Sequence, residues 1–357
     1  MKPSRVLSAA LALLFVLPSL WADTTVSYKY EIKPGAGAPA QMLGPAMEAA
    51  RSKMPTRTVI QIKGKLARAA SSPFVTVSDL DKQVITVIDP AHNQFATVYM
   101  KDYQDQVLSL LQGSMPAMPA DARKIMDSMQ SSFSSQNTGK TDTVLGIQVE
   151  ETEMTLAVSM PAKPGAAPSG DATPAAAAPQ VLLQMVIHLW TALPSEVERV
   201  PALKEFSAVY GDPSANQMID PTGSMGKIFG SLPGMGTGFA SMIDAMQEKK
   251  AIILKTQFEM YVPMAQAMLA AQARAKGTDP AQTADATAPF MEMTVEVENI
   301  SGAPIDDSVF AVPGGYRLVS VPELLKSLMP AAPAAEAKDA ATPSAPVAAK
   351  AEAAPQN

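Results

Sequence analysis

Strict alternation of apolar and polar residues is the feature that most constrains how this chain folds. Residues 290–300 show it most clearly, with Met291, Met293, Val295 and Val297 alternating with Glu292, Thr294, Glu296 and Glu298. Residues 25–33 and 58–66 follow the same pattern. Because successive side chains of a strand point to opposite faces, a period of two predicts strands with one buried and one solvated face.

Further strands and helices are predicted from the same kind of pattern. Residues 143–158 predict an acidic strand pair or one bent strand, and the apolar residues 180–191 predict a strand buried on both faces. The other predicted strands are 73–80, 83–89, 94–100 and 251–262, and the predicted helices are 45–54, 121–133, 201–210, 238–249, 263–275 and 322–329. Since the strands follow one another through tight turns, with helices between runs of strands, we expect an α+β fold with helices on one face of an antiparallel sheet.

Two segments have a composition that cannot form a packed core. Residues 161–179 and 330–357 are rich in Ala and Pro and carry almost no large apolar side chains. Such segments cannot offset their ordering entropy, so both are predicted to be disordered, with residues 276–288 a weaker case. The expected organisation is one folded domain at 23–329, with a disordered insert at 161–179 and a disordered tail at 330–357.

The N-terminus has the layout of a cleavable secretory signal. Lys2 and Arg5 precede the apolar run 6–20, and Ala22 is a small residue at the expected cleavage site. The run is shorter than the roughly 20 apolar residues of a spanning helix, and Pro18 interrupts it; a retained membrane anchor is the alternative. We expect residues 1–22 to be removed and the mature protein to be soluble, either periplasmic or secreted.

Composition excludes several kinds of partner. The chain has no Cys, so it has no disulfide, thiolate metal ligand or lipidated cysteine. Its formal charge of −6 becomes −8 once the two positive charges of Lys2 and Arg5 are removed. An acidic chain without a basic block is not expected to bind nucleic acid. We also expect no stable membrane insertion of the mature chain and no cofactor.

The order of several short motifs resembles a family. These motifs are Lys63-Gly64-Lys65 with Arg68, Val87-Ile88-Asp89-Pro90 leading into Phe95 to Tyr99, Thr138-Gly139-Lys140-Thr141 before Val144-Leu145-Gly146-Ile147, the Trp190 strand, and Ile305 to Tyr316. In this order the chain, over roughly 24–320, resembles an uncharacterised group of exported bacterial proteins that is similar to periplasmic lipoprotein carriers of the LolA/LppX type. No single motif is specific to the group.

The resemblance implies both a fold and a function. It implies a strongly curved antiparallel sheet, an incomplete barrel, with helices packed on its concave face. In the carriers that face receives acyl chains, so the resemblance implies binding of a lipid or of the acyl end of a lipoprotein. The 161–179 insert and the helix at 263–275 depart from the minimal carrier pattern.

Motifs for catalysis are missing from the sequence. The only histidines, His92 and His188, lie in a predicted turn and in a predicted apolar strand, and neither G-x-S-x-G nor H-E-x-x-H is present. Ser224 and Lys227 match S-x-x-K, but Gly226 opposes the helix which that motif needs. We therefore expect a protein that is not an enzyme.

Two groups of carboxylates have simple structural interpretations. Glu150, Glu151 and Glu153 are interpreted as the solvent face of a strand, and Asp306 and Asp307 as the opening of a turn before Phe310. Calcium is the alternative at either group, although neither has the ligand spacing of a known calcium loop. We predict no metal site from them.

Methionine is unusually frequent, with 23 residues against ten Phe, seven Tyr and two Trp. Its side chains are typical of an irregular core or of an adaptable apolar groove, and M-x-x-M pairs also permit a Cu(I) site. The Gly-rich segment 222–238 carries apolar side chains, which favours either a lid over a groove or an ordinary connection. The candidate groove and lid residues are Ile228, Phe229, Leu232, Met235, Phe239, Met242, Met246, Met126 and Met129.

Two main functional hypotheses follow. The first is an exported carrier that binds a lipid or a lipoprotein acyl chain. The second is a structural or protein-interaction module of the cell envelope with a closed core. Cu(I) binding through methionine is a minor third.

Overall fold

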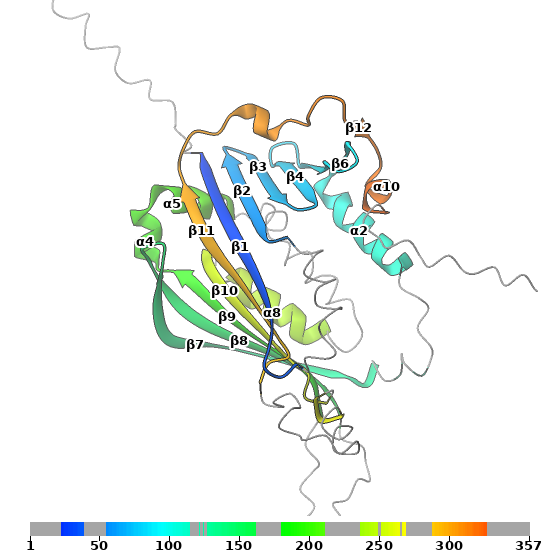
Figure 1. The fold of residues 1–357 in the computed structure, drawn as a ribbon, viewed down its shortest axis with the longest axis vertical. Coiled ribbons are helices and arrows are strands. Elements are labelled where there is room, and N and C mark those ends of the chain that lie inside the picture. Colours follow the sequence, from blue (N-terminus) through cyan, green and yellow to red (C-terminus); the bar gives the residue numbers. More distant parts are fainter. Residues whose placement is uncertain are drawn as a thin grey trace, which may run out of the picture.

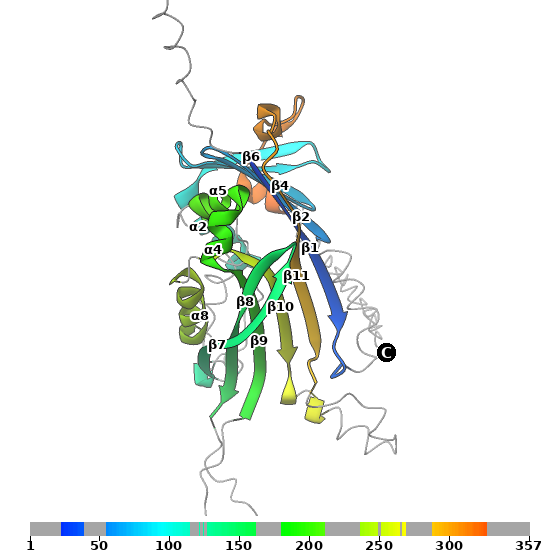
Figure 2. The same cartoon turned by 90° about the vertical axis from the view of Figure 1, so that its left-hand side faces the viewer.

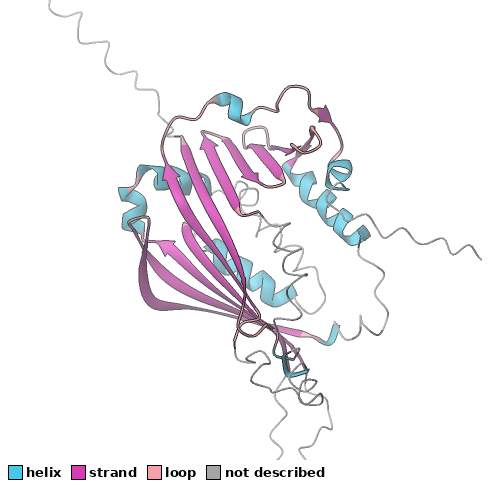
Figure 3. Cartoon of the chain, in the orientation of Figure 1, coloured by secondary structure: helices cyan, strands magenta, loops and turns pink. Residues whose placement is uncertain are grey.

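A single large sheet dominates the molecule (Figure 1). The computed structural model describes residues 23–38, 55–114, 121, 124, 127–161, 180–210, 236–248, 251–264, 266–268 and 288–326. Twelve strands form one curved, unclosed sheet in the order β12-β6-β5-β4-β3-β2-β1-β11-β10-β9-β8-β7. The expected α+β class is confirmed, although strands outweigh helices strongly (Figure 3).

The strands and helices have the following bounds. The strands are β1 (Thr24–Pro34), β2 (Arg57–Lys63), β3 (Leu66–Ser71), β4 (Phe74–Asp79), β5 (Val84–Asp89), β6 (Gln94–Tyr99), β7 (Gln130–Val144), β8 (Ile147–Met160), β9 (Gln180–Ala192), β10 (Ile253–Tyr261), β11 (Met291–Ser301) and β12 (Arg317–Leu318). The helices are α2 (Met100–Ser114), α4 (Pro194–Arg199), α5 (Pro201–Tyr210), α8 (Gly236–Glu248), the 3-10 helix η2 (Asp307–Phe310) and α10 (Val321–Lys326).

The first part of the sheet is a meander of short hairpins. Strands β1 to β6 pair antiparallel with their sequence neighbours. The single strand predicted at 58–66 is wrong, because Gly64 adopts a φ of +58° and turns the chain between β2 and β3. Glycine reaches this left-handed region without a steric penalty. The strands predicted at 73–80, 83–89 and 94–100 are confirmed as β4, β5 and β6.

The second part of the sheet is a meander of long strands, β7 to β10. Residues 143–158 comprise the last two residues of β7, the turn at Leu145-Gly146 and most of β8. The segment is therefore mainly one strand, β8, and most of its pairing partner lies earlier, at residues 130–142. The helix predicted at 121–133 extends too far, because Phe133 lies in β7 opposite Leu156. The apolar strand β9 is confirmed, but most of its side chains are only partly buried, so burial on both faces is wrong.

Pairing between β1 and β11 joins the two parts into one sheet. The register runs from Thr25 opposite Ser301 to Pro34 opposite Met291. The strands predicted at 25–33 and 290–300 are therefore confirmed as β1 and β11, which lie side by side. The register shifts between Ser27 and Tyr28, and the adjacent Val26 and Ser27 are both buried, so the alternation of burial is interrupted there. All pairs are antiparallel except β12 with β6, which is parallel. The expectation of a wholly antiparallel sheet is wrong at that edge.

Helices cover the sheet in separate places. In Figure 2, α4, α5 and α8 lie on the same side of β1 and β11. Helix α5 contacts β1 and β11, α8 contacts β7 and β8, and α2 contacts β5 and β6. Helix α10 packs on α2 and β6. Helices predicted at 201–210, 238–249 and 322–329 correspond to α5, α8 and α10, whereas α2 and α4 were not predicted.

The sheet forks where β10 and β11 separate. Their pairing ends at Lys255 opposite Glu296. Beyond that point β11 continues along β1, while β10 continues along β9. Helix α5 fills the fork, because one buried cluster joins its Leu203 and Phe206 to residues of both branches, including Val26, Val297, Val149, Ala192 and Leu254.

Strand β8 changes its buried face along its length. Near the fork the buried positions are Ile147, Val149 and Glu151, and farther along they are Thr152, Met154, Leu156 and Val158. The first two contact the α5 cluster, and Met154 and Leu156 pack with Phe239 and Met242 of α8. Strand β8 therefore packs against α5 with side chains of one face near the fork, and against α8 with side chains of the other face farther along.

Several predicted segments lie outside the described residues. They are the signal at 1–22, the helix at 45–54, the insert at 161–179, the weaker segment at 276–288, most of 222–238 and the tail at 330–357. The helix at 263–275 is described only at 263–264 and 266–268, where it is helical. Among the described residues, none of the helices is both long enough and apolar enough to cross a membrane.

Candidate binding pocket

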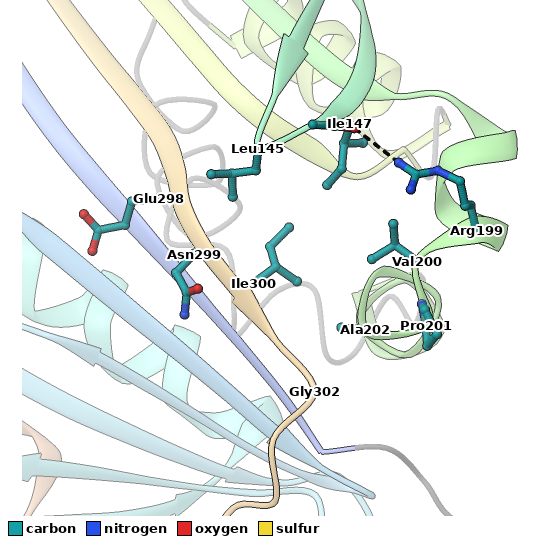
Figure 4. Close-up of a pocket in the computed structure, with 11 residues that line it drawn as sticks. Leu145, Ile147, Arg199, Val200, Pro201, Ala202, Glu298, Asn299, Ile300 and Gly302 are labelled. Carbon is teal, nitrogen blue, oxygen red and sulfur yellow. Dashed lines mark hydrogen bonds between the residues drawn. The ribbon is translucent and has the colours of Figure 1, made fainter.

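A pocket of about 560 Å³ lies at the fork of the sheet (Figure 4). Three separate segments form its wall: the turn between β7 and β8, the junction of α4 with α5, and the end of β11. Its apolar side chains are Leu145, Ile147, Val200, Pro201, Ala202 and Ile300. This volume lies within the range of about 300–1,000 Å³ that is usual for small-molecule sites.

Leu145 is an unusual residue for its place in the wall. It and Gly146 form the two-residue loop between Val144 and Ile147, with φ values of +52° and +76°. Positive φ at both positions defines a type I′ turn, whose first position favours Asn, Asp or Gly. Leu145 is also 51% exposed. A leucine here costs about 1–2 kcal/mol of backbone strain and leaves apolar surface in water.

Polar groups hold the turn in place beside the pocket. Arg199 Nη2 donates a hydrogen bond of 3.2 Å to the carbonyl oxygen of Gly146, which ties α4 to the turn (Figure 4). The same guanidinium pairs with Glu196, and this hydrogen bond lowers the pKa of the Glu196 carboxyl and raises that of Arg199. On the opposite wall, Glu298 pairs with Arg57, while Asn299 also lines the pocket.

The candidate residues predicted from the sequence do not line this pocket in the described structure. Phe239 and Met242 are buried against Met154, Leu156 and Leu189, and Met246 is partly buried against the same cluster. Met129 is partly buried just before β7. Ile228, Phe229, Leu232, Met235 and Met126 lie outside the described residues. Contact of any of these residues with a ligand stays a prediction.

Apolar side chains also continue across the sheet beyond α8. The register places Ile32 opposite Met293, Met293 opposite Phe258, and Phe258 opposite Ile187. A parallel row joins Met291, Met260 and Met185. Ile32, Met260, Met291 and Met293 are partly buried. Methionine is thus concentrated on one face of β9–β11, as well as beneath α8.

The opposite face carries a polar cluster around Glu151. This carboxylate is 2% exposed and accepts hydrogen bonds from His188 Nδ1 at 2.9 Å and Thr138 Oγ1 at 2.5 Å. Lys140 Nζ lies 3.0 Å from it. Burial raises the pKa of the Glu151 carboxyl, but the hydrogen bonds from Thr138, Lys140 and His188 outweigh burial, so the pKa lies below its usual value. Glu150, Glu151 and Glu153 were interpreted as the solvent face of a strand, and for Glu151 this prediction is wrong because the side chain is buried.

A second carboxylate lies beyond the imidazole of this cluster. Glu259 Oε1 lies 4.0 Å from His188 Nε2, and its other oxygen accepts a 2.6 Å hydrogen bond from Tyr261. Burial, followed by the hydrogen bond to Glu259, raises the pKa of Tyr261 to about 12. Each of these side chains points at a neighbour, so the cluster ties β7, β8, β9 and β10 together. Sequence reasoning missed it because His188 and Glu151 are far apart in the chain.

Three further carboxylates, Asp306, Asp307 and Asp89, have structural roles. Asp306 caps η2 by accepting a hydrogen bond of 2.8 Å from Ser308 N, which confirms its predicted turn role. Asp307 forms an ion pair with Lys63. Asp89 accepts hydrogen bonds from the backbone of Ala91 and the ring of His92, in the predicted turn. Within the described ranges no group of three or more His, Cys, Asp or Glu side chains is placed to hold a metal ion.

Comparison with known proteins adds no assignment. No protein-family model matches the chain, and no curated protein gives a significant match. The fork pocket is therefore interpreted from its own geometry. It offers a mainly apolar wall, few polar groups and no paired nucleophile and base among its lining residues.

Proposed function

We propose that this protein binds an apolar or amphipathic ligand, such as a lipid acyl chain, in the fork pocket and performs no catalysis. The observation that carries the proposal is Leu145, an exposed leucine in a strained turn at the pocket wall. A residue that is unfavourable for its backbone conformation, and that lowers stability for that reason, is typical of a functional position. Contact with an apolar ligand gives a reason for keeping leucine where asparagine would fit better.

The composition of the pocket supports an acyl chain as the ligand. Each buried methylene contributes about 0.8 kcal/mol, so partial burial of one chain suffices for micromolar affinity, which corresponds to about 8 kcal/mol. The polar Asn299 and Glu298 at one wall suit a ligand with a polar end. The unclosed, curved sheet also supports a relation to carriers of the LolA/LppX type. Export through the signal at 1–22 would place the protein in the periplasm or outside the cell.

A binding experiment tests the proposal. Protein purified gently from the envelope is extracted for lipid analysis by mass spectrometry, and the stripped protein is titrated with a fluorescent fatty acid. We expect Leu145→Asn to weaken binding about tenfold, because it removes about 1.4 kcal/mol of apolar contact. Ile300→Asn, from another segment of the wall, is expected to act in the same direction.

Leu318→Asn is the matched control. Leu318 is another exposed leucine, but it lies in β12, away from the pocket. This variant is expected to bind like the unchanged protein. Absence of copurified lipid together with absence of fatty-acid binding would overturn the proposal. Equal affinities of the Leu145 and Leu318 variants for the fatty acid would show that the ligand binds at another site.

A further inference from the structure

The fork leaves one side of β11 without a neighbouring strand. Strand β11 pairs with β1 as far as Ser301, whereas its pairing with β10 ends at Glu296. Residues 297–301 therefore have a strand on one side only, and we call them the fork edge. In Figure 4, β1 lies on one side of the fork edge, and Leu145 and Val200 lie on the other side, across the pocket. Backbone groups of the fork edge that point away from β1 therefore face the pocket.

The register shows which backbone groups of the fork edge these are. In an antiparallel ladder, residues that bond to one neighbouring strand alternate with residues whose backbone groups point the other way. Tyr30 N donates to the carbonyl oxygen of Thr56 on the β2 side, so even-numbered residues of β1 bond toward β2 and odd-numbered ones toward β11. Asn299 and Ser301 lie opposite odd-numbered residues of β1. Ile300, between them, therefore directs its N–H and C=O away from β1 and toward the pocket.

The pocket side of Ile300 carries one donor and one acceptor without a partner. No backbone group of the described residues bonds to its N–H or C=O from that side. The neighbouring side chain of Asn299 is exposed, and it too forms no hydrogen bond within the described part of the chain. A secondary amide offers the complementary pair, because it accepts through its oxygen and donates through its N–H, as a residue of an adjacent strand would.

The charged side chains of the pocket wall are already paired within the protein. Arg199 forms an ion pair with Glu196. Glu298, on the opposite wall, pairs with Arg57. An ionised head group therefore meets no unpaired charge of opposite sign among the lining residues, and it would lose hydration on entering a mainly apolar pocket. A neutral polar group fits this wall better.

The start of α5, which also lines the pocket, is a poor anion site. Helix N-termini bind anions through free N–H groups, but Pro201, the first residue of α5, has no N–H. The N–H groups of Leu203 and Lys204 both bond to the carbonyl oxygen of Val200, at 2.9 and 3.1 Å. Most of the donors that an anion would need are therefore absent or occupied.

We propose that the fork pocket binds an acyl chain joined to its polar end through a secondary amide, and that this amide pairs with the backbone of Ile300. The proposal rests on the apolar ligand proposed above and adds the chemical class of its polar part. The ligand amide accepts from Ile300 N and donates to Ile300 O, while the acyl chain lies against the apolar wall around Leu145. An ester or an ionised fatty acid has no N–H, so each lacks the donor for the Ile300 carbonyl oxygen.

Three uncharged probes with the same acyl chain test the amide. N-methyldodecanamide has the donor and the acceptor, whereas N,N-dimethyldodecanamide and methyl dodecanoate have only the acceptor. In calorimetric titration of the full, lipid-stripped protein, we expect N-methyldodecanamide to bind about fivefold more tightly than the other two, as one additional neutral hydrogen bond implies. Equal affinities of the three probes would overturn the amide proposal but leave the apolar pocket in place. Binding of none of them would overturn both.

Ile300→Pro tests the protein side of the same contact. Proline is tolerated in a strand where its N–H would lie outside the ladder, so pairing with β1 is expected to persist, and circular dichroism checks it. The control is Ile300→Val, which keeps the N–H. We expect Ile300→Pro to bind all three probes about fivefold more weakly than Ile300→Val does, with the preference for N-methyldodecanamide retained, because the Ile300 carbonyl oxygen remains.

Two results with these variants would overturn the assignment to Ile300. One is equal binding by Ile300→Pro and Ile300→Val. The other is loss of the preference for N-methyldodecanamide in Asn299→Ala, which would show that the Asn299 side chain, rather than the backbone, recognises the amide.

A fourth probe, N-dodecanoyl glycylglycinamide, distinguishes two sources of such an amide. It continues the acyl amide into a short peptide. If it binds more tightly than N-methyldodecanamide, the pocket recognises the acylated end of a peptide, and if it binds equally or less tightly, the ligand is a simple acyl amide. Both results agree with the proposal only when the two amides bind more tightly than methyl dodecanoate; weaker binding of both would overturn it.

Discussion

Leu145 destabilises the fold in two ways, through its strained backbone and through its exposed apolar side chain. Its φ of +52° is a left-handed conformation, which strains a leucine but suits asparagine. We therefore expect Leu145→Asn to raise the free energy of unfolding by about 1 kcal/mol, even as it weakens ligand binding. Urea unfolding of the ligand-free protein measures this change. Loss of stability in this variant would show that the exposed side chain contributes more to the fold than its strain costs.

Glu151 is a buried charge that depends on its partners. Lys140, Thr138 and His188 approach its two oxygens from β7 and β9. Replacement of this carboxylate by an amide leaves the Lys140 ammonium without its negative partner. It also places an NH2 group, which donates, where one of the three partners needs an acceptor. We expect Glu151→Gln to lower the free energy of unfolding by about 2–4 kcal/mol at pH 7. Glu150→Gln, at the partly exposed neighbour, is the control, with a smaller expected loss.

The effect of Glu151 depends on pH with a definite sign. Its pKa is lower in the folded chain than the ordinary 4.5. A carboxyl of this kind stabilises the fold above its unfolded pKa, and that contribution is lost as the pH falls through the folded pKa. The stability difference between the unchanged protein and Glu151→Gln should therefore be constant from pH 7 to about 5 and shrink below about 4.5. Urea unfolding at each pH measures it, and a difference that grows on acidification would contradict the assigned sign.

At the scale of elements, the end of the β1–β11 ribbon depends on close backbone contact. Gly37 N donates to the carbonyl oxygen of Pro289, and a Cβ on Gly37 would lie 2.2 Å from the carbonyl oxygen of Ala288. Gln266 is buried beside them and donates to Gly37 O and Ala288 O, at 3.1 Å each. The contact admits no side chain without movement of the backbone.

Gly37→Ala should therefore destabilise the protein by about 2 kcal/mol or more. Thermal unfolding measures the loss. Gly314→Ala is the matched control, because a Cβ there meets no atom within 4 Å and the φ of Gly314 is not positive. Equal stability of the two variants would mean that the 288–289 backbone moves away at little cost.

Helix α5 is the element on which the fork depends. Phe206 is 1% exposed and belongs to a cluster that draws on both branches of the sheet. Phe206→Ala is expected to cost about 3–5 kcal/mol, as large truncations in packed cores do. Leu318→Ala, at an exposed leucine, should change stability by less than about 0.5 kcal/mol. Chemical unfolding of both variants provides the comparison.

Local periodicity predicted the strands better than it predicted the helices. The alternation of β1, β2 and β11 was visible because apolar and polar residues alternate along most of each strand. Helix α2 was not predicted, although Tyr103 and Val107 have the spacing of one helical face. The helix at 121–133 was extended into β7 because Phe133 fits the same spacing, and pairing with β8 overrides that local preference.

The fork pocket could not be predicted from the sequence, because its wall combines segments that are distant along the chain. Its wall joins residues 145–147, 199–202 and 298–302, and their proximity depends on where β10 and β11 separate. No local pattern reports that separation. The turn at Leu145-Gly146 was the one available signal, since an apolar residue before glycine in a tight hairpin is unusual. The methionine pattern instead led to α8, where Met242 is buried in the core.

At the scale of the whole molecule, long-range pairing should make folding slow. Residues 25–34 pair with residues 291–301, so the central part of the sheet needs both ends of the fold. Proteins dominated by such non-local pairs fold in milliseconds to seconds. We expect the protein to refold on the order of seconds, and the fluorescence of Trp190 in stopped flow measures this rate. Refolding within microseconds would mean that Trp190 reports only the local β8–β10 meander.

The position of β1 between β2 and β11 has a consequence during biosynthesis. Strand β1, the first of the described strands to be synthesised, acquires its second neighbour only after the chain has been extended as far as residue 301. Until then the two meanders are separate, and β1 and β10 each present an edge that β11 will later cover. A chaperone that keeps the nascent chain unpaired would protect both edges over this interval. Synthesis that stalls before residue 291 would leave a product with two uncovered strands and a tendency to aggregate.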